Sequence, residues 1–142
     1  MSDRTLRILH VFRAPLGGLF RHVIDVTRAQ VARGHEVGLF CDATTGGDRA
    51  NTVLEDLRPL LTLGVNRVRM RRDPNWTDLT ALLALQRVYR DMQPDVLHGH
   101  GSKGGAYVRL VRSRTLDATT IRAYTPHGGS FNYKPGTLLH RA

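Results

Sequence analysis

The residues of this sequence that are best suited to chemistry lie in three short segments, each of which follows an apolar run. They are Gly17 and Gly18 after the first run, His100, Gly101 and Lys103 after a later one, and His127 and Gly128 after the last. Glycine lets a backbone approach a ligand closely, and the free N–H groups at a helix start attract anions such as a diphosphate. Histidine can bind or release a proton near neutral pH. Together these segments form the candidate site.

One of these segments also contains a pattern that is typical of dinucleotide binding. Gly99, Gly101 and Gly104 form G-x-G-x-x-G between an expected strand and an expected helix. Such a site also needs an acid at the end of the following strand, where this chain has Tyr124. Asp42 ends another expected strand as a ribose-binding acid would, but the turn after the strand before it lacks the G-x-G-x-x-G pattern. The glycine pattern and the acid thus belong to different strand–helix units of the chain. A nicotinamide-binding domain of an oxidoreductase therefore stays as an alternative.

The histidines of the candidate site raise a second alternative, a zinc centre. His98, His100 and His127 could supply three imidazole ligands, but no carboxylate or cysteine accompanies them at metal-ligand spacing. We therefore expect no metal. His98 ends an apolar run, so we interpret it as a packing residue.

The elements that position these residues follow from the apolar pattern. Short apolar runs alternate with longer segments of helical period, which is typical of βαβ units. The expected strands are Arg7–Phe12, Val37–Cys41, Val65–Met70, Asp95–His98 and Thr119–Tyr124. Right-handed crossovers between them predict an α/β fold with a doubly wound, mostly parallel Rossmann-like sheet of about five strands. Ligands on such sheets bind at the carboxyl ends of the strands, where the three segments would meet.

Helices are expected between the strands. The first has apolar residues at helical spacing from Phe20 to Val31, and Gly34 stands where a left-handed cap is needed. The second, over 48–63, is interrupted by Pro59. The third should bury a stripe and end before Pro94, and the fourth should begin near Lys103. The members of the stripe are Leu79, Leu82, Leu85, Tyr89 and Met92.

Composition limits the possible partners. The chain has 142 residues and a net charge of +9, which favours anionic partners. The only local group of arginines is Arg67, Arg69, Arg71 and Arg72, whose alternation is typical of one face of a strand. No aromatic stacking motif accompanies it, so we expect no nucleic acid partner. A non-enzymatic, basic anion-binding module stays as a further alternative.

A single cysteine and the lack of a long apolar stretch bear on location. Cys41 lies in an apolar run, where a small buried thiol is the usual explanation. No apolar stretch approaches the roughly 18 residues of a membrane span. We expect a cytoplasmic protein.

Taken together, these segments resemble the amino-terminal domain of glycosyltransferase family 4, whose members have the two-domain GT-B fold. The resemblance covers nearly the whole chain and rests on motifs at the expected strand ends. These are Arg7-Ile8-Leu9-His10-Val11-Phe12 with Gly17-Gly18 and His22, then Ala32-Arg33-Gly34-His35-Glu36-Val37, Pro94-Asp95-Val96-Leu97-His98-Gly99-His100 and Thr125-Pro126-His127-Gly128.

The resemblance implies a retaining glycosyltransferase that uses a nucleotide-sugar donor and a glycan or lipid-linked acceptor, with no cofactor. Gly17 and Gly18 would approach the donor diphosphate through backbone amides. His127 would be the catalytic residue facing the transferred sugar. The resemblance assigns His100, Gly101, Lys103 and Gly128 to substrate binding.

The chain departs from the family pattern at its carboxyl end. It stops at Ala142 without the Glu-x7-Glu motif of the family's donor-binding domain. We therefore expect residues 1–142 to be an amino-terminal domain that is incomplete at its carboxyl end, lacks its partner domain and is inactive alone. Its expected location is the cytoplasm, with peripheral contact at the inner face of the membrane as an option.

Overall fold

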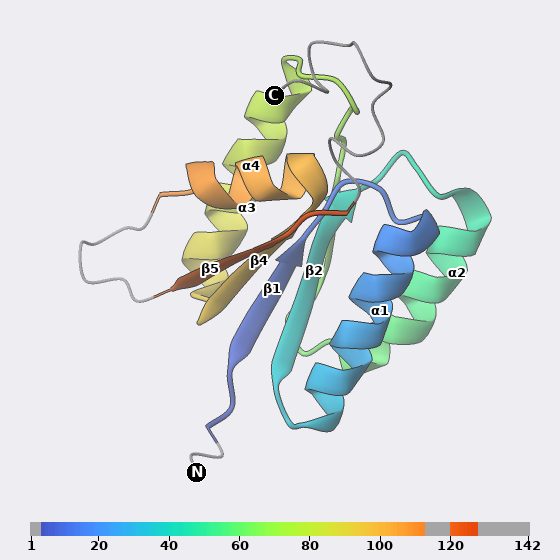
Figure 1. The fold of residues 1–142 in the computed structure, drawn as a ribbon, viewed down its shortest axis with the longest axis vertical. Helices are drawn as coiled ribbons and strands as arrows, with labels where there is room; N and C mark the ends of the chain where they lie inside the picture. Colours follow the sequence, from blue (N-terminus) through green and yellow to red (C-terminus); the bar gives the residue numbers. More distant parts are fainter. Residues whose placement is uncertain (1–3, 113–119, 128–142) are drawn as a thin grey trace.

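The computed structural model describes residues 4–112 and 120–127. Its centre is a sheet of five parallel strands in the order β3-β2-β1-β4-β5 (Figure 1). The strands are β1 (Arg7–Val11), β2 (Glu36–Asp42), β3 (Gly64–Val68), β4 (Val96–His100) and β5 (Ile121–Thr125). The prediction of a doubly wound, Rossmann-like α/β sheet is confirmed.

Helices cover both faces of the sheet. Within the described residues they are α1 (Gly17–Ala32), α2 (Gly47–Leu57), α3 (Thr77–Met92), α4 (Gly101–Leu110) and the short 3-10 helix η1 (Arg58–Leu60). In Figure 1, α1 and α2 lie on one side of the strands, whereas α3 and α4 lie on the other. None of these helices has both the length and the apolar character that crossing a membrane requires.

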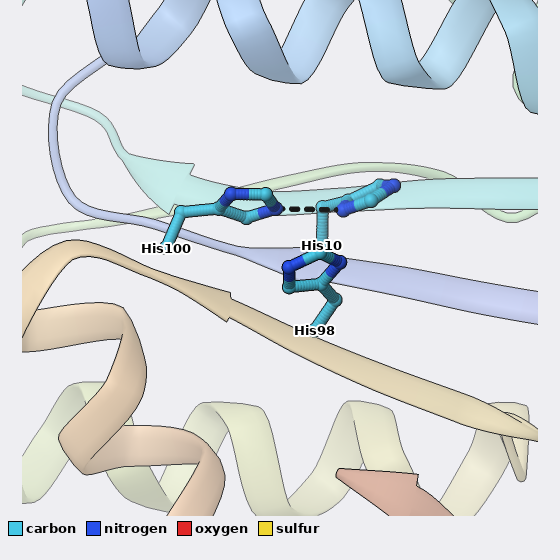
Figure 2. A group of neighbouring side chains, drawn as sticks. All are labelled: His10, His98 and His100. Atoms are coloured by element: carbon cyan, nitrogen blue, oxygen red, sulfur yellow. Dashed lines mark hydrogen bonds between the residues drawn. The ribbon is translucent and has the colours of Figure 1, made fainter. Parts of the chain in front are cut away.

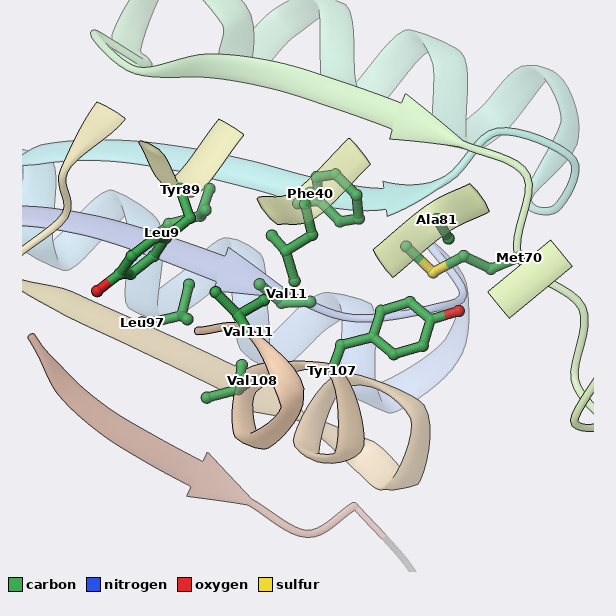
Figure 3. Close-up of a cluster of buried hydrophobic side chains, with 11 residues drawn as sticks. Leu9, Val11, Phe40, Met70, Ala81, Tyr89, Leu97, Tyr107, Val108 and Val111 are labelled. Atoms are coloured by element: carbon green, nitrogen blue, oxygen red, sulfur yellow. The ribbon is translucent and has the colours of Figure 1, made fainter. Parts of the chain in front are cut away.

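Each face of the sheet has its own apolar core because alternate strand residues point to opposite sides. On the α1 and α2 side, Ile8 and Phe12 pack with helix residues such as Phe20. On the other side, Leu9 and Val11 pack with residues of α3 and α4, including Tyr107 (Figure 3). The strands are thus apolar on both faces, as expected of a parallel sheet.

Two predicted chain breaks are confirmed. Gly34 follows α1 with a φ of +88°, a left-handed conformation that glycine adopts without steric cost. The second helix ends at Leu57, and Pro59 lies in η1. Proline lacks the N–H that would continue the α-helical hydrogen bonds.

The predicted apolar stripe of α3 is wrong in part. Leu79 is 63% exposed, whereas the buried face consists of Thr77, Ala81, Leu85 and Tyr89. Because each helical residue turns by about 100°, Leu79 points roughly opposite to Ala81. Both positions are apolar, so hydrophobic spacing alone did not show which of them faces the sheet.

Two strand ends also differ from expectation. β3 ends at Val68, so Arg69, Arg71 and Arg72 lie beyond it and are exposed instead of forming one strand face. Only Arg67 of that group belongs to the strand, and it donates hydrogen bonds to the carbonyl oxygen of Asp42. β4 continues to His100, and α4 follows it directly.

The order of the strands creates a switch point between β1 and β4. The chain passes from β1 to β2 on one side, whereas β4 and β5 continue the sheet on the other. The loops after β1, β4 and β5 therefore meet at the carboxyl edge of the sheet, where ligands bind in open α/β sheets.

Candidate functional site

The turn between β1 and α1 leaves backbone N–H groups open to a ligand. Gly17 begins the helix with a φ of +70°, and a Cβ on Gly18 would meet nothing within 4 Å. Leu16 precedes the helix and its apolar side chain does not cap it. The first N–H groups of α1 are therefore available to attract an anion.

A cavity of about 520 Å³ lies beside this turn, between the starts of α1 and α2. Gly17 and Gly18 line it together with Arg21, Arg49 and Asp25. Guanidinium groups suit phosphates and carboxylates, so the two arginines make the cavity fit for an anionic group. Sequence reasoning missed both arginines because exposed helix arginines have no distinctive spacing.

The start of α4 lies next to the start of α1. Gly101 begins α4 with a φ of +72°, and a Cβ on it would lie 3.1 Å from Cδ1 of Leu19 in α1. His100 precedes α4 and does not cap the helix with its side chain. Two uncapped helix N-termini thus share the carboxyl edge of the sheet.

Close packing of α4 against the sheet explains the other glycines of the G-x-G-x-x-G pattern. A Cβ on Gly104 would collide with the backbone oxygen of Val11, and one on Gly99 would collide with the backbone of Gly104. A Cβ on Gly105 would lie 2.6 Å from the ring of Tyr124. Packing alone accounts for Gly99, Gly104 and Gly105, so their presence is not by itself evidence for a nicotinamide site.

Within the part of the chain that the structure describes, five imidazole rings gather at the same edge. This histidine cluster consists of His10 from β1, His22 from α1, His98 and His100 from β4, and His127, which follows β5. Figure 2 shows its three strand members pointing to the same face of the sheet.

Strand register brings the first three rings together. His10 pairs with His98 in the parallel register of β1 and β4, and His100 points to the same face because it lies two residues further along. The rings of His98 and His100 are stacked at 4.0 Å between centroids. The ring of His22 lies 5.1 Å from that of His127.

A chain of hydrogen bonds runs through the cluster from α1 to His127. The Oε1 atom of Gln30 lies 2.8 Å from Nε2 of His10 and accepts its hydrogen bond. His10 Nδ1 then accepts from His100 Nε2 at 2.9 Å, and His100 Nδ1 accepts from His127 Nε2 at 3.1 Å. Because Gln30 is the acceptor at one end, each of the three rings in this chain has a defined tautomer. Nδ1 of His127, at the other end, keeps a lone pair.

The surroundings keep these rings neutral. Burial, with a smaller contribution from neighbouring imidazoles, lowers the pKa of His10 to about 4 and that of His100 to about 2, although the hydrogen bond to Gln30 opposes the shift at His10. Burial also lowers the pKa values of His98 and His127. Neutral rings have one donor and one acceptor each, which is what the hydrogen-bond chain requires.

His98 is a packing residue with a polar contact. It is half-buried, and its Nε2 atom lies 2.7 Å from Oγ1 of Thr125 at the end of β5. The hydrogen bond ties the edge strand to β4 and places Thr125, two residues before His127, beside the cluster.

Lys103 does not point toward the histidine cluster. Its ammonium group lies 2.7 Å from Oδ1 of Asp78 in α3, on the opposite face of the sheet, and Tyr107 donates to the same carboxylate oxygen. Although burial opposes it, these hydrogen bonds hold the pKa of Asp78 below its usual range. The structure therefore shows Lys103 in an ion pair that joins α3 to α4.

The structure gives Asp42 a local structural role. Its buried carboxylate accepts hydrogen bonds from the hydroxyls of Thr44 and Thr45 and from the backbone N–H of Met70. Its acceptor sites are thus used within the protein, which leaves little for a ribose. Gly128 lies outside the described residues.

Of the residues that were predicted from the sequence, the structure brings together Gly17, Gly18, Gly101, His100 and His127 at one edge. Sequence reasoning missed the contribution of Gln30 and of His10, which is buried. The available signal was that His10 interrupts an apolar strand in the same way as His98, and that these strands are neighbours in the predicted sheet.

Fold and site together define a Rossmann-like ligand-binding domain whose helix starts and histidines face the carboxyl edge of a parallel sheet. The model of the glycosyl transferase 4-like domain family matches residues 17–142. The chain therefore belongs to this family of glycosyltransferase domains, which confirms the resemblance seen in the sequence.

A solved structure has a similar fold. MurG from Acinetobacter baumannii superposes with a TM-score of 0.55 at 16% identity, over 74% of this chain and 32% of that one. The likeness shows the fold, that of one half of a GT-B protein. This chain thus spans about a third of the length of MurG. No curated protein sequence matches it.

Proposed function

We propose that residues 1–142 are the acceptor-side, amino-terminal domain of a retaining glycosyltransferase. The enzyme transfers a sugar from a nucleotide-sugar donor to a glycan or lipid-linked acceptor, and a second domain supplies most of the donor site. The observation that carries the proposal is the meeting of two uncapped helix N-termini with His127 at the carboxyl edge of the sheet.

The helix starts suit the leaving group of this reaction. When the bond between the sugar and the diphosphate breaks, negative charge grows on the diphosphate oxygens. The N–H groups at Gly17 and Gly18 are preoriented donors, and such donors stabilise a charge that develops in the transition state. The adjacent start of α4 at Gly101 adds a second positive dipole end.

His127 is proposed to face the transferred sugar. Its Nε2 atom is engaged by His100, so its orientation is set by the hydrogen-bond chain from Gln30. Nδ1 is then the atom that can accept a hydrogen bond from a sugar hydroxyl. His127 would act by holding the sugar while the bond to the acceptor oxygen forms.

The acceptor is proposed to enter from the side of the cavity at α1 and α2. Arg21 and Arg49 line this cavity and could hold an anionic group of a lipid-linked acceptor. Such an acceptor would bring the cytoplasmic enzyme to the inner face of a membrane. Gly128 completes the proposed substrate contacts. His100 and Lys103 are proposed to support them indirectly, His100 through its hydrogen bond to His127 and Lys103 through its ion pair with Asp78 at the start of α3.

Amide shifts in ¹H–¹⁵N spectra of the 142-residue chain test the proposal. Titration with UDP-glucose or GDP-mannose should give saturable shifts at Gly17, Gly18 and Gly101, because their N–H groups would approach the diphosphate. Binding should be weak, since most donor contacts are assigned to the other domain. Leu110, at the far end of α4, serves as an internal reference that should not shift.

Two results would overturn this function. Saturable shifts with NAD⁺ but with neither nucleotide sugar would identify a dinucleotide-binding domain instead. Shifts confined to exposed arginines such as Arg71 and Arg72, produced equally by duplex DNA and removed by salt, would identify a basic anion-binding module.

A further inference from the structure

We infer that His22, His100 and His127 form a binding site for a divalent transition-metal ion of the zinc type. One ring nitrogen of each lies within 4.8 Å of the others. The three residues come from separate parts of the chain, namely α1, the end of β4 and the position after β5. This inference does not depend on the proposed glycosyltransferase function.

The separations are close to those of a bound ion. With metal–nitrogen bonds of about 2.0–2.1 Å, two ligands of a tetrahedral ion are about 3.3 Å apart. Nδ1 of His100 and Nε2 of His127 already lie 3.1 Å apart. His22 is exposed on α1 and, among the described residues, makes no hydrogen bond that would hold its ring away. A small side-chain movement therefore completes the set.

A second trio, His10, His98 and His100, is less suitable. Its ring nitrogens are also within 4.8 Å of one another, but their hydrogen bonds are already made within the protein. His10 is bonded to both Gln30 and His100, and His98 to Thr125. An ion there would have to break these bonds in a buried position, whereas the outer trio opens to solvent at His22.

The inner histidines instead support the outer site. A histidine that binds a metal usually donates its other ring N–H to a fixed acceptor, which orients the ring. His100 meets this condition, because its Nε2–H donates to His10, and His10 donates in turn to Gln30. The chain from Gln30 thus leaves the lone pair of His100 Nδ1 pointing at His127.

Metal binding requires only a shift of one proton within a ring. His127 donates through Nε2 in the metal-free chain, so that proton has to leave before Nε2 can bind the ion. A neutral imidazole can carry it on Nδ1 instead, and no net proton is released. In the metal-bound state Nδ1 of His127 would therefore donate a hydrogen bond to a sugar hydroxyl, whereas in the metal-free chain it accepts one. The hydrogen bond between His100 and His127 is then replaced by two metal–nitrogen bonds.

The site leaves one tetrahedral position open. Three neutral imidazoles do not cancel the charge of a dication, so water, hydroxide or an oxygen of an anionic ligand would take the fourth position. The site also lies near the start of α4 at Gly101, and the positive end of the helix dipole favours an anionic ligand there. Imidazole ligands suit Zn²⁺ and Co²⁺ and disfavour Mg²⁺.

Cobalt titration tests the inference directly. The untagged 142-residue chain is stripped with a chelator and titrated with Co²⁺, whose visible absorption reports tetrahedral nitrogen coordination. We expect one ion per chain and displacement by Zn²⁺. His22→Ala should weaken binding by at least about tenfold, since even an outer partner of a metal ligand is worth about 10- to 100-fold.

Two variants serve as controls. Arg28→Ala changes an exposed residue of α1 outside the cavity, and His98→Gln removes a ring of the inner trio only. Both should bind Co²⁺ as the unchanged chain does. Imidazole NMR signals of the unchanged chain give a measure that needs no variant, because Zn²⁺ should move those of His22, His100 and His127 while His35 stays still.

Three results would overturn the inference. The first is no saturable cobalt absorption. The second is binding that survives His22→Ala but is lost in His98→Gln, which would place the ion in the inner trio. The third is a zinc-induced shift at His35 equal to that at His22, which would indicate adventitious binding by surface histidines.

Discussion

At the scale of single residues, Gln30 has an influence that its position on a helix does not reveal. Its side-chain amide oxygen, Oε1, is the fixed acceptor at one end of the hydrogen-bond chain that runs through His10 and His100 to His127. A neutral imidazole can carry its proton on either nitrogen, so the acceptor determines which tautomer the chain adopts.

Replacing this acceptor should change the protonation pattern of His127. In Gln30→Leu, measured with a chelator present, the ring nitrogens of His127 should shift toward the average of the two tautomers in long-range ¹H–¹⁵N spectra. Arg28→Gln, an exposed change on the same helix, is the matched control and should leave the spectrum unaltered. An unchanged His127 spectrum in Gln30→Leu would show that another group sets the tautomer.

Asp42 is a residue whose charge matters for stability. Burial raises its pKa, but hydrogen bonds from Met70, Thr44 and Thr45 outweigh burial, and the net pKa lies below its usual value. Because the folded pKa is the lower one, this contribution to stability is present above the pKa of the unfolded chain, about 4. It is lost as the pH falls through the folded value.

We expect Asp42→Asn to lower the free energy of unfolding at pH 7 by about 1.5–3 kcal/mol, the usual range for hydrogen bonds to a charged group. Urea unfolding at pH 7 and at pH 3 measures the effect. The difference between the two proteins should shrink at pH 3, and a difference that grows with acid would contradict the assignment.

At the scale of elements, the contact between α4 and the sheet depends on missing side chains. Gly104 lies directly against the backbone of Val11 in β1, and Gly99 lies against Gly104. This close approach fixes where α4 begins, and therefore where its N-terminus faces the site.

A single methyl group should disturb this contact. Gly104→Ala should destabilise the chain by about 1–3 kcal/mol, as expected for overpacking, although alanine is the better helix former. Gly18→Ala is the matched control, because a Cβ there meets nothing within 4 Å and it should be neutral or slightly stabilising. Thermal unfolding followed by circular dichroism compares them, and equal melting temperatures would refute the packing argument.

The same scale shows how much the sequence could predict. The spacing of apolar residues identified the five strands, and the positions of glycine and proline identified the cap at Gly34 and the break at Pro59. These features depend on local backbone chemistry. The buried face of α3 was predicted wrongly at Leu79, because which apolar side packs is decided by the sheet beneath it.

Contacts across the chain were the harder part of the site. Lys103 lay next to the candidate loop in sequence, but Asp78 in α3 binds its ammonium group on the other face. His10 is 90 positions from His100, and only the pairing of β1 with β4 brings them together. Local sequence patterns do not show that Lys103 pairs with Asp78 or that His10 contacts His100.

At the scale of the whole molecule, the proposed function makes this domain one side of a reaction site. The helix N-termini and His127 face outward from one sheet edge, and the nucleotide-sugar contacts of the proposed enzyme are divided between two domains. Catalysis requires the reacting groups to be held together in the correct geometry, which one domain cannot do alone.

The purified 142-residue chain should therefore not transfer or hydrolyse sugar. Incubation with UDP-glucose or GDP-mannose should release no nucleoside diphosphate above the level of a heat-denatured sample. Enzyme-coupled detection of the diphosphate makes the measurement. Steady release that is lost in His127→Ala would show that this chain is a complete catalyst and that a second domain is not required.

The histidine cluster also has a consequence for how the chain folds. It joins the first strand to residues that follow the last described one, so its hydrogen bonds close long stretches of chain, such as the 90 positions from His10 to His100. Contacts so distant in sequence form late, after the entropy of closing the intervening loop has been overcome. The imidazole NMR signals of these histidines would therefore report a late step of folding. They should reach their native positions only when the edge strand has joined the sheet.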